Sequence, residues 1–372
     1  MTRVKAVFRV DSSVQMGIGH LMRCLTLADS LCGKGAEVAF VCRRLVGSAS
    51  ELVEQRGHAV YRLPVPESGA PPAASGLSHA GFLGVGPERD AAETLAVLQG
   101  IQPIDWLIID HYAIDARWER EMRRCAGRIM VIDDLADRTH DCDILLDQNL
   151  SHDMEARYEG LVPETCQLFL GPRHALLRLE FYEARRHLRE RDGTVRRILV
   201  FFGGSDPTNE TVKALEAIRL LRRSDLDVDV VVGAANPHKL DIEQECAGMP
   251  HATYHCQVEN MAELMAKADL SIGAGGSATW ERCFLGLPSI TVVIAENQRE
   301  STSMVAAVGA TLDIGCCGEV HVETLANAVR TFLGSASLLR GMSLNAFRVM
   351  EGEKTSPWGA ALIDAIMRDE YA

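Results

Sequence analysis

No stretch of the 372-residue chain approaches the roughly 18 consecutive apolar residues that a membrane-spanning helix needs. We therefore expect no stable insertion into a membrane. The opening residues, Met-Thr-Arg-Val-Lys, also lack the apolar core and the small-residue cleavage site of a signal peptide. These two absences lead us to expect a cytoplasmic protein.

Basic residues are in the minority, because 38 Lys and Arg stand against 51 Asp and Glu and give a formal net charge of −13. A basic surface is the usual footprint of non-specific nucleic-acid binding, so we expect no nucleic-acid partner. An anionic small ligand is still compatible with this charge, because backbone amides and helix N-termini bind phosphate whatever the net charge.

The 11 cysteines show no C-x-x-C spacing, and the only adjacent pair is Cys316 and Cys317. This pattern argues against a zinc site and against a disulfide framework. Several thiols, including Cys24 and Cys283, fall within expected helices. We interpret the cysteines as reduced thiols that fill small apolar spaces, and we expect neither a metal nor another cofactor.

The first half of the chain alternates strand-like and helix-like segments. Strands are expected at residues 4–10, 37–42, 58–63, 106–110 and 128–132, and helices from about residue 20, at 89–98 and at 116–124. Strands that alternate with helices predict a parallel sheet with right-handed crossovers. Residues 64–88 are rich in Gly, Pro, Ala and Ser, which indicates a long surface loop.

The same plan restarts in the second half, after a charged helical stretch at residues 178–191. Further strands are expected at residues 197–202, 228–232, 252–256, 270–272 and 290–294. We therefore predict an α/β protein with two Rossmann-like, doubly wound domains, over residues 1–180 and 195–372. Such folds bind ligands outside the carboxyl ends of their strands, which predicts a cleft shared by the two domains.

The first candidate site follows the first strand, where Asp11 precedes a turn with Gly17 and Gly19 that leads into the helix at His20. Glycines permit a tight turn and a close approach of the backbone to a ligand. The dinucleotide fingerprint G-x-G-x-x-G is incomplete, because Met22 occupies the third glycine position. His20 is a candidate proton acceptor, since the helix dipole disfavours imidazolium at a helix start. The alternative is a histidine bonded to the backbone.

Polar residues also follow the two later strands of the first half. Asp110, His111 and Tyr112 come after one strand, and Asp133 and Asp134 after the next. By the carboxyl-end rule we expect them to face the cleft. The acids could orient a histidine, bind sugar hydroxyls or cap the following helices. Together they resemble a divalent-metal site, although nothing in their spacing requires one.

Two glycine turns follow strands in the second half and suit a phosphate cradle. Their candidate ligand-binding residues are Gly204, Ser205, Gly275, Gly276 and Ser277. Glu281, on the helix after the longer turn, could accept hydrogen bonds from a ribose. The alternative is that Ser277 caps this helix and Glu281 is solvated. Asn297 and Gln298 follow a further strand and could cap a helix or contact a base or sugar.

Taken together, these segments resemble the UDP-2,4-diacetamido-2,4,6-trideoxy-β-L-altropyranose hydrolases of pseudaminic acid biosynthesis. The resemblance runs from the first strand to about residue 310. It is carried by residues 8–13, 17–20, 108–112, 142–147, 158–163, 175–178, 181–182, 203–206 and 297–298. Compared with that family, residues 64–88 and the tail beyond residue 320 are longer.

The resemblance implies the glycosyltransferase-B architecture, with UDP bound mainly by the C-terminal half and the sugar between the domains. It also implies that His20 is the catalytic base for an inverting attack of water on a UDP-linked 2,4-diacetamido-2,4,6-trideoxy sugar, in which UDP leaves. Arg178 would then be a substrate contact, or else a charged surface position on the connecting helix.

Three rival functions fit the same sequence. A transferase of the same fold would need an acceptor, and a UDP-sugar 2-epimerase would keep the sugar linked to UDP. A non-catalytic nucleotide-sugar-binding protein would bind UDP and release none from the sugar. The sequence leaves the stereochemistry of the sugar, its N-acyl groups and the oligomeric state open.

Overall fold

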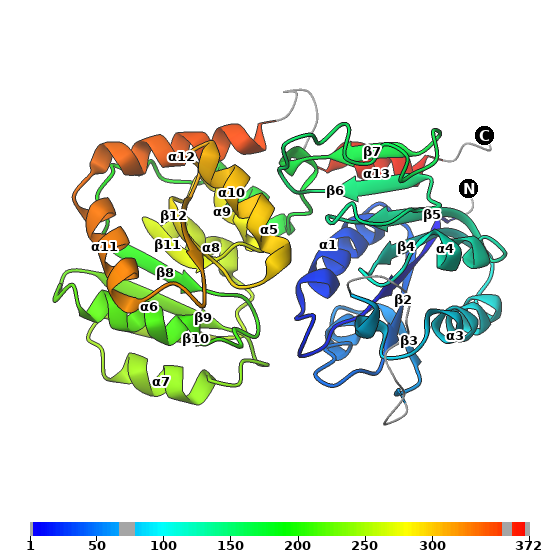
Figure 1. Cartoon of the computed structure of the whole chain (residues 1–372), viewed down its shortest axis with the longest axis horizontal. Coiled ribbons are helices and arrows are strands. Elements are labelled where there is room, and N and C mark those ends of the chain that lie inside the picture. Colours follow the sequence, from blue (N-terminus) through cyan, green and yellow to red (C-terminus); the bar gives the residue numbers. More distant parts are fainter. Residues whose placement is uncertain (1–2, 67–78, 352–358, 369–372) are drawn as a thin grey trace. The chain divides into compact units, whose positions relative to one another are not determined.

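The computed structural model describes residues 3–66, 79–351 and 359–368, which form two compact units (Figure 1). The first unit contains the described residues up to Asn149, residues Asp153–Leu176 and a helix near the C-terminus. The second unit contains Leu150–His152 and the chain from Leu177 to residue 351. Each unit has its own parallel sheet.

The first unit contains a seven-stranded parallel sheet in the order β3-β2-β1-β4-β5-β6-β7. Its strands are β1 (Lys5–Val10), β2 (Glu37–Arg43), β3 (Ala59–Leu63), β4 (Ile104–Asp110), β5 (Ala126–Ile132), β6 (Ile144–Asp147) and β7 (Gln167–Leu170). The five strands expected from the sequence are confirmed. Strands β6 and β7 were not expected, because four residues are too few to show a strand period.

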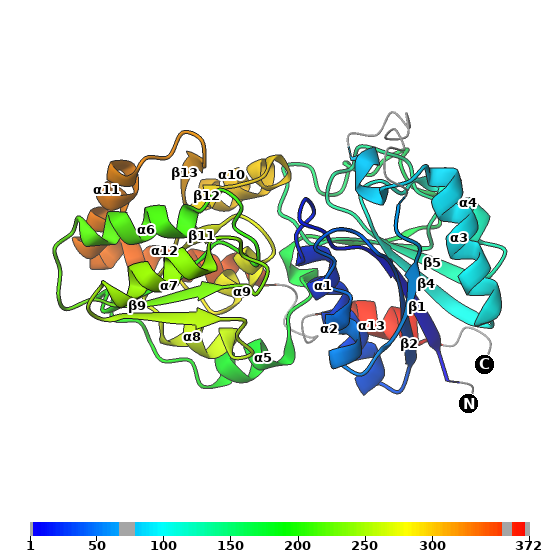
Figure 2. The same cartoon turned by 90° about the horizontal axis from the view of Figure 1, so that it is seen from below.

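Helices cover both faces of this sheet and bury an apolar layer on each (Figure 2). They are α1 (Gly19–Gly33), α2 (Glu51–Gln55), α3 (Pro87–Gly100), α4 (Ala116–Met122) and α13 (Ala360–Met367), with 3-10 turns η1 (Ala80–Leu83) and η2 (Pro172–His174). Local signals fix two of the helix starts. Pro87 is the first residue of α3, and the Asp115 carboxylate accepts from the backbone N–H groups of Arg117 and Trp118 at the start of α4.

The long loop expected at residues 64–88 falls partly on residues 67–78, which lie outside the described residues. Its later part contains η1 and the start of α3, so the helix begins two residues earlier than expected.

The second unit contains a six-stranded parallel sheet in the order β10-β9-β8-β11-β12-β13. Its strands are β8 (Arg197–Phe201), β9 (Asp227–Val232), β10 (Ala252–Cys256), β11 (Leu270–Ala274), β12 (Ser289–Val293) and β13 (Leu312–Cys316). Strand β13 was not among the expected strands. The two doubly wound sheets confirm the predicted α/β fold class.

The helices of this unit pack around one apolar core that the strands share. They are α5 (Leu179–Arg186), α6 (Glu210–Arg219), α7 (Lys239–Ala247), α8 (Met261–Lys267), α9 (Ala278–Phe284), α10 (Arg299–Ala307), α11 (Val322–Leu333) and α12 (Ala336–Met350), with a 3-10 turn η3 (Glu296–Gln298). The charged helix expected at residues 178–191 is shorter, because α5 ends at Arg186. No helix within the described ranges has the length and apolar character to cross a bilayer.

Both sheets reverse their winding direction at a central strand pair. In the first sheet β1 lies between β2 and β4, and in the second sheet β8 lies between β9 and β11. The loops that leave such a pair diverge to opposite faces, and the crevice between them is where open α/β sheets bind ligands. Four of the turns that the sequence analysis selected follow β1, β4, β8 and β11 and so lie at these two positions. The other two selected segments, at residues 133–134 and 297–298, follow β5 and β12.

Helix α13 packs on the first unit, beside α1, although the sequence analysis assigned residues 195–372 to the second domain (Figure 2). The physical reason is an apolar pair one turn apart: Leu362 and Ile366 are fully buried in the core of the first unit. The indole Nε1 of Trp106, on β4, donates to the carbonyl of Ile366 at 2.9 Å. The chain therefore returns to its first unit after completing the second.

This packing predicts that α13 stabilises the first unit. Ile366→Ala removes a fully buried side chain and should lower the free energy of unfolding by about 2–5 kcal/mol. Urea unfolding followed by tryptophan fluorescence measures the change. Asp364→Ala, at an exposed position on the same helix, is the matched control and should change stability by less than about 0.5 kcal/mol. Equal stability of the two variants would contradict the assignment of α13 to this core.

Candidate functional site

His20 and Asp110 meet at the crevice of the first sheet. His20 is the second residue of α1, and Asp110 is the last residue of β4. The imidazole Nδ1 lies 2.6 Å from Asp110 Oδ1, and both side chains are buried. The structure thus brings together two residues that the sequence analysis selected from segments 90 positions apart.

The hydrogen bonds of Asp110 fix the tautomer of His20. Although burial favours the neutral acid, Arg23 and His20 hold the pKa of Asp110 well below its usual range, so its carboxylate is ionised and can only accept. A contact of 2.6 Å therefore requires a proton on His20 Nδ1. In the neutral ring this leaves Nε2 as a proton acceptor.

Arg23 is the residue of this cluster that sequence reasoning missed. Its Nε donates to Asp110 Oδ2 at 2.6 Å and its Nη2 to Asp110 Oδ1 at 2.7 Å, a bidentate pair. The available signal was spacing, because residues three apart on a helix share a face, and His20 and Arg23 are such a pair. Although burial opposes its charge, Asp110 and Asp134 raise the pKa of Arg23 well above its usual value.

Tyr112 and Asp134 complete the cluster. The ring of Tyr112 meets the imidazole of His20 edge-on, with centroids 4.5 Å apart and planes at 85°. Asp134 accepts from the Tyr112 hydroxyl at 2.6 Å and from Arg23 Nη1 at 2.9 Å. Of the alternatives raised for Asp134, orientation of the histidine environment therefore describes its contacts better than helix capping.

Asp11 and His111 belong to a second buried network of the first unit. Asp11 is fully buried and accepts from Arg9 Nη1 at 2.7 Å, from Arg9 Nη2 at 2.9 Å and from the backbone N–H of Arg43 at 2.6 Å. His111 accepts from the Ala113 N–H through Nδ1 and faces Asp11 through Nε2 at 3.3 Å. Both carboxylate oxygens of Asp11 therefore accept hydrogen bonds from protein groups, which points to a structural role for Asp11 and His111.

Asp133 is also held inside the first unit. Its carboxylate pairs with Arg138 at 2.8 Å and accepts from the Ala136 N–H at 2.9 Å. The hydroxyl of Tyr158 lies 3.2 Å from Asp133 Oδ2 and 3.1 Å from Asp147 Oδ2. Burial, followed by the charge of Asp134, raises the pKa of Asp147 to about 7.

The turn before α1 uses one of its two glycines for backbone geometry. Gly17 has a φ of 72°, which favours glycine, and its N–H donates to the Ser13 carbonyl at 2.8 Å. A Cβ on Gly19 would meet no atom within 4 Å among the described residues. Gly19 is exposed, so packing does not demand glycine at this position.

The glycine loop after β11 is closely backed by other segments of the second unit. A Cβ on Gly275 would stand 2.1 Å from Thr302 Oγ1, and one on Gly276 would stand 3.6 Å from Gln298 Nε2. Ser277 is exposed, and its hydroxyl makes no capping bond to α9 within the described part of the chain. Gln298 accepts from the Ile294 N–H at 3.2 Å, and Asn297 is exposed beside it. The loop and the 297–298 turn thus come together.

The turn after β8 presents Gly204 and Ser205 partly exposed. The carbonyl oxygen of Gly204 would lie 2.2 Å from a Cβ on Gly233, so the turns after β8 and β9 are in close contact. Asp206 is buried and accepts from the N–H groups of Glu210 and Thr211, both at 2.9 Å. Since this carboxylate caps α6, the groups available to a ligand are those of the preceding turn.

Glu281 and Arg178 form an ion pair within the second unit. Arg178 Nη2 donates to Glu281 Oε1 at 3.0 Å, and Arg178 Nη1 lies 2.6 Å from Glu180 Oε1. The guanidinium of Arg178 lies 5.0 Å from the ring centroid of Phe181. Glu281 is therefore not simply solvated, and Arg178 is more than a charged surface position.

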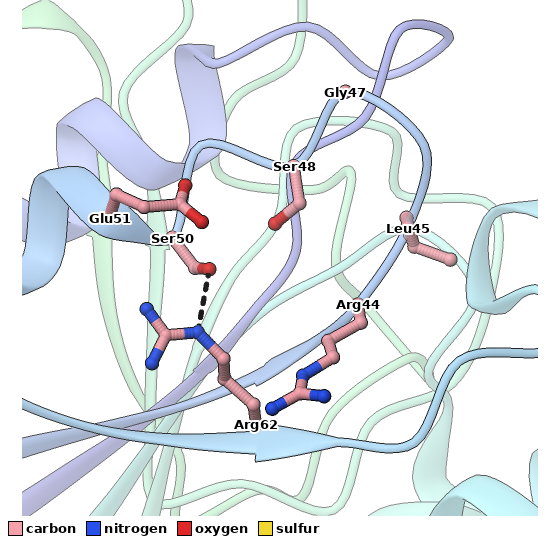
Figure 3. A pocket seen from close by; sticks show the side chains of 7 residues that line it. All are labelled: Arg44, Leu45, Gly47, Ser48, Ser50, Glu51 and Arg62. Carbon is pink, nitrogen blue, oxygen red and sulfur yellow. Dashed lines mark hydrogen bonds between the residues drawn. The ribbon is translucent and has the colours of Figure 1, made fainter.

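A pocket of about 380 Å³ lies at the ends of β2 and β3 in the first unit (Figure 3). It is lined by Arg44, Leu45, Gly47, Ser48, Ser50, Glu51 and Arg62. Arg62 donates to Ser50 Oγ and forms a bidentate pair with Glu54. Glu54, through this pair, and Glu51, through its charge, therefore both offset the charge of the Arg62 guanidinium.

Within the residues that the structure describes, no group of three or more His, Cys, Asp or Glu side chains is arranged to hold a metal ion. The Asp110, Asp133 and Asp134 carboxylates instead bind arginine, histidine and tyrosine side chains.

The contacts of Asp110 predict how much this residue contributes to the free energy of unfolding. Asp110→Asn leaves the buried Arg23 guanidinium without this ion partner and should lower the free energy of unfolding by about 3 kcal/mol at pH 7. Because the folded-state pKa of Asp110 is lowered, this contribution is present above the unfolded-state pKa of about 4 and is lost as the pH falls below it. Urea unfolding at several pH values measures both effects.

Glu54→Gln is the matched control, because the Glu54–Arg62 pair is partly exposed and an exposed ion pair contributes little to stability. If Asp110→Asn cost no more than this control, the ion pair would not be the stabilising element of the cluster.

Known proteins resemble this chain in sequence. Residues 198–350 match the glycosyltransferase family 28 C-terminal domain. The chain is 27% identical over 307 residues to the UDP-2,4-diacetamido-2,4,6-trideoxy-beta-L-altropyranose hydrolase of Campylobacter jejuni, over 82% of this chain and 97% of that protein. It is 25% identical over 303 residues to the uncharacterized protein MJ1062 of Methanocaldococcus jannaschii, over 80% of this chain and 57% of that protein.

A third relative is the spore coat polysaccharide biosynthesis protein SpsG of Bacillus subtilis, 29% identical over 219 residues, or 58% of this chain and 62% of that protein. The chain thus spans less than two thirds of the length of MJ1062 and of SpsG.

Solved structures share the fold. MurG of Acinetobacter baumannii superposes with a TM-score of 0.63 at 14% identity, over 98% of this chain and 99% of that one. Arabidopsis thaliana UGT89C1 complexed with UDP gives a TM-score of 0.68 at 13% identity, over 98% of each chain. The architecture is that of the glycosyltransferase-B fold, and the relatives support the family resemblance that the sequence motifs predicted.

Proposed function

We propose that this protein hydrolyses a UDP-linked 2,4-diacetamido-2,4,6-trideoxy sugar to the free sugar and UDP, with inversion at the anomeric carbon, in pseudaminic acid biosynthesis. The observation that carries the proposal is the His20–Asp110 pair, in which the carboxylate binds Nδ1–H and leaves Nε2 as a proton acceptor. The relatives already support a less specific conclusion, that the protein is a UDP-sugar-related enzyme of sugar biosynthesis.

In the proposed reaction, a water molecule attacks the anomeric carbon on the face opposite UDP and gives its proton to His20 Nε2. The bond between the anomeric carbon and the UDP oxygen breaks, and its electron pair leaves with UDP. The transition state has oxocarbenium character. Asp110 keeps the ring in the reactive tautomer, and Arg23 keeps Asp110 ionised.

The second unit is the proposed UDP site. Backbone N–H groups of the turns at residues 203–205 and 275–277 are suited to a diphosphate, because successive amides form anion-binding concavities. UDP is a good leaving group that such donors stabilise as charge develops, so no dedicated general acid is needed. In this proposal Glu281 accepts from the ribose, and Arg178 holds its carboxylate in place.

The names of the relatives support this assignment in different degrees. One relative is a hydrolase of the proposed substrate, and another acts in polysaccharide biosynthesis according to its name. The match of residues 198–350 to a glycosyltransferase domain favours a second candidate, a UDP-sugar transferase that needs an acceptor. The 2-epimerase alternative has support from the fold alone, because a putative UDP-N-acetylglucosamine 2-epimerase shares it.

One assay separates these functions. Purified protein is incubated with a panel of UDP-linked 2,4-diacetamido sugars in water, without an acceptor, and the products are followed by NMR. We expect free sugar and UDP, with the first-formed anomer inverted. Turnover only after an acceptor is added would indicate the transferase, and a changed sugar still linked to UDP would indicate the epimerase. Binding without any turnover would indicate the non-catalytic alternative.

His20→Ala tests the proposed base. Because general-base catalysis contributes about 10²–10⁴ in rate, kcat should fall at least 100-fold while the affinity for UDP changes little. Steady-state kinetics and calorimetry with UDP measure the two quantities. His187→Ala, at an exposed position, is the control and should retain full activity. Near-normal turnover of a folded His20→Ala variant would remove His20 from the mechanism.

Glu281→Ala tests the proposed ribose contact. A ribose bond is present in the ground state and in the transition state alike, so its loss should raise KM roughly tenfold and leave kcat nearly unchanged. Glu281→Gln, which retains a hydrogen-bond acceptor, should fall between the variant and the natural protein. If KM and UDP affinity were unchanged in Glu281→Ala, the ribose assignment would be wrong.

A further inference from the structure

Arg282, on α9, is a buried charge with few partners. Its exposed fraction is 1%. Its Nη2 donates to the Ala274 carbonyl at 2.8 Å and to Thr279 Oγ1 at 3.0 Å. Neither Nε nor Nη1 has a hydrogen-bond partner among the described residues, and no carboxylate from those residues pairs with the guanidinium. The arginine is therefore desolvated without an opposite charge to compensate it.

Such an arrangement is unfavourable for folding. A buried charge normally requires a paired and hydrogen-bonded partner, and apolar side chains of similar volume are often equal or better for stability. Burial lowers the pKa of Arg282 to about 10, so the group is still protonated at neutral pH. Its positive charge is thus retained at a cost, which calls for a role beyond packing.

The guanidinium lies beneath the glycine loop of the second unit. Arg282 Nη1 is 3.0 Å from the position that a Cβ on Gly273 would occupy, at the end of β11. Thr302 backs the same loop: it is 2% exposed, its Oγ1 has no hydrogen-bond partner in the described ranges, and it would stand 2.1 Å from a Cβ on Gly275. Two buried side chains, Arg282 and Thr302, therefore lie against residues 273–276 with polar atoms that have no hydrogen-bond partner among the described residues.

The adjacent carboxylate does not neutralise this charge by direct contact. Glu281 interacts electrostatically with Arg282, but its Oε1 accepts from Arg178. The positive potential of Arg282 consequently extends to the loop backbone, whose other side is the candidate ligand surface.

We propose that Arg282 is a positioning residue that holds the diphosphate of a uridine nucleotide at the glycine loop through its buried charge, from behind the loop and without touching the ligand. This inference rests on the proposed assignment of UDP to that loop. The class of ligand it selects is a nucleotide carrying two or more negative charges, rather than the neutral nucleoside.

The expected size of the effect follows from Coulomb's law. At an effective dielectric constant of about 20, opposite unit charges within about 8 Å of each other change affinity on the order of tenfold or more. Because the charge is buried, salt screens it less than it screens a surface lysine or arginine. The effect should therefore increase with the negative charge of the ligand and persist at moderate salt.

The test compares UDP with uridine on the full chain. Calorimetry measures UDP, and saturation-transfer NMR with competition measures uridine, for the natural protein, Arg282→Met and Arg282→Lys. Arg219→Met is the matched control, because Arg219 is an exposed arginine of the same unit that pairs with Glu245. If Arg282→Met does not fold, Arg282→Gln, which retains amide donors but no charge, takes its place.

We expect Arg282→Met to weaken UDP binding about tenfold with uridine binding unchanged, Arg282→Lys to recover most of the UDP affinity, and Arg219→Met to behave as the natural protein. Thermal unfolding of Arg282→Met should occur at the same temperature or a higher one. Equal losses of UDP and uridine binding, or no loss of either, would overturn the inference. Failure of the natural protein to bind UDP would instead overturn the proposed function.

Discussion

The ionised carboxylate of Asp110 organises the polar end of the first sheet. It is fully buried, so its charge requires donors, and α1 supplies them from one face through His20 and Arg23. The same bonds dock α1 onto β4 and fix the imidazole tautomer. Arg23 also donates to Asp134, which accepts from Tyr112. Stability and the candidate chemistry of this unit therefore depend on one charge, and a change in it alters both.

Each sheet has a crevice at its central strand pair, and the chemical groups at the two crevices differ. At the β1–β4 crevice the functional groups are side chains held by ion pairs, which suits proton transfer. At the β8–β11 crevice the exposed groups are backbone and hydroxyl donors of glycine turns, which suits a phosphate. Glycine is needed at Gly275 because Thr302 leaves no room for a Cβ.

The sequence predicted those features that depend on local pattern. Alternating apolar strands and helices identified two parallel sheets, and strand ends selected His20, Asp110 and the glycine loops, which the structure brings to the two crevices. Four-residue strands such as β6 were missed because they show no period. Arg23 was missed because its partner is 87 residues away, and spacing alone does not name a partner.

Asp11 was selected from the sequence as a ligand contact, but the structure buries it among protein partners. Its position after β1 suggested a ligand contact, but the charged Arg9 among the apolar residues that follow Lys5 in this strand was the signal that a buried carboxylate must lie nearby. Arg282 was passed over for a similar reason: one charge on a helix is usually solvated, and only the packing of β11 and α9 shows that this one is enclosed.

The return of α13 to the first unit has a practical consequence for dissecting the protein. A fragment that ends near residue 176 would contain every strand of the first sheet yet expose the apolar surface that Leu362 and Ile366 cover, and it would leave the Trp106 indole without its acceptor. To express this unit alone, the terminal helix must therefore be kept. It could be fused ahead of β1 or joined after Leu176, in either case through a short linker.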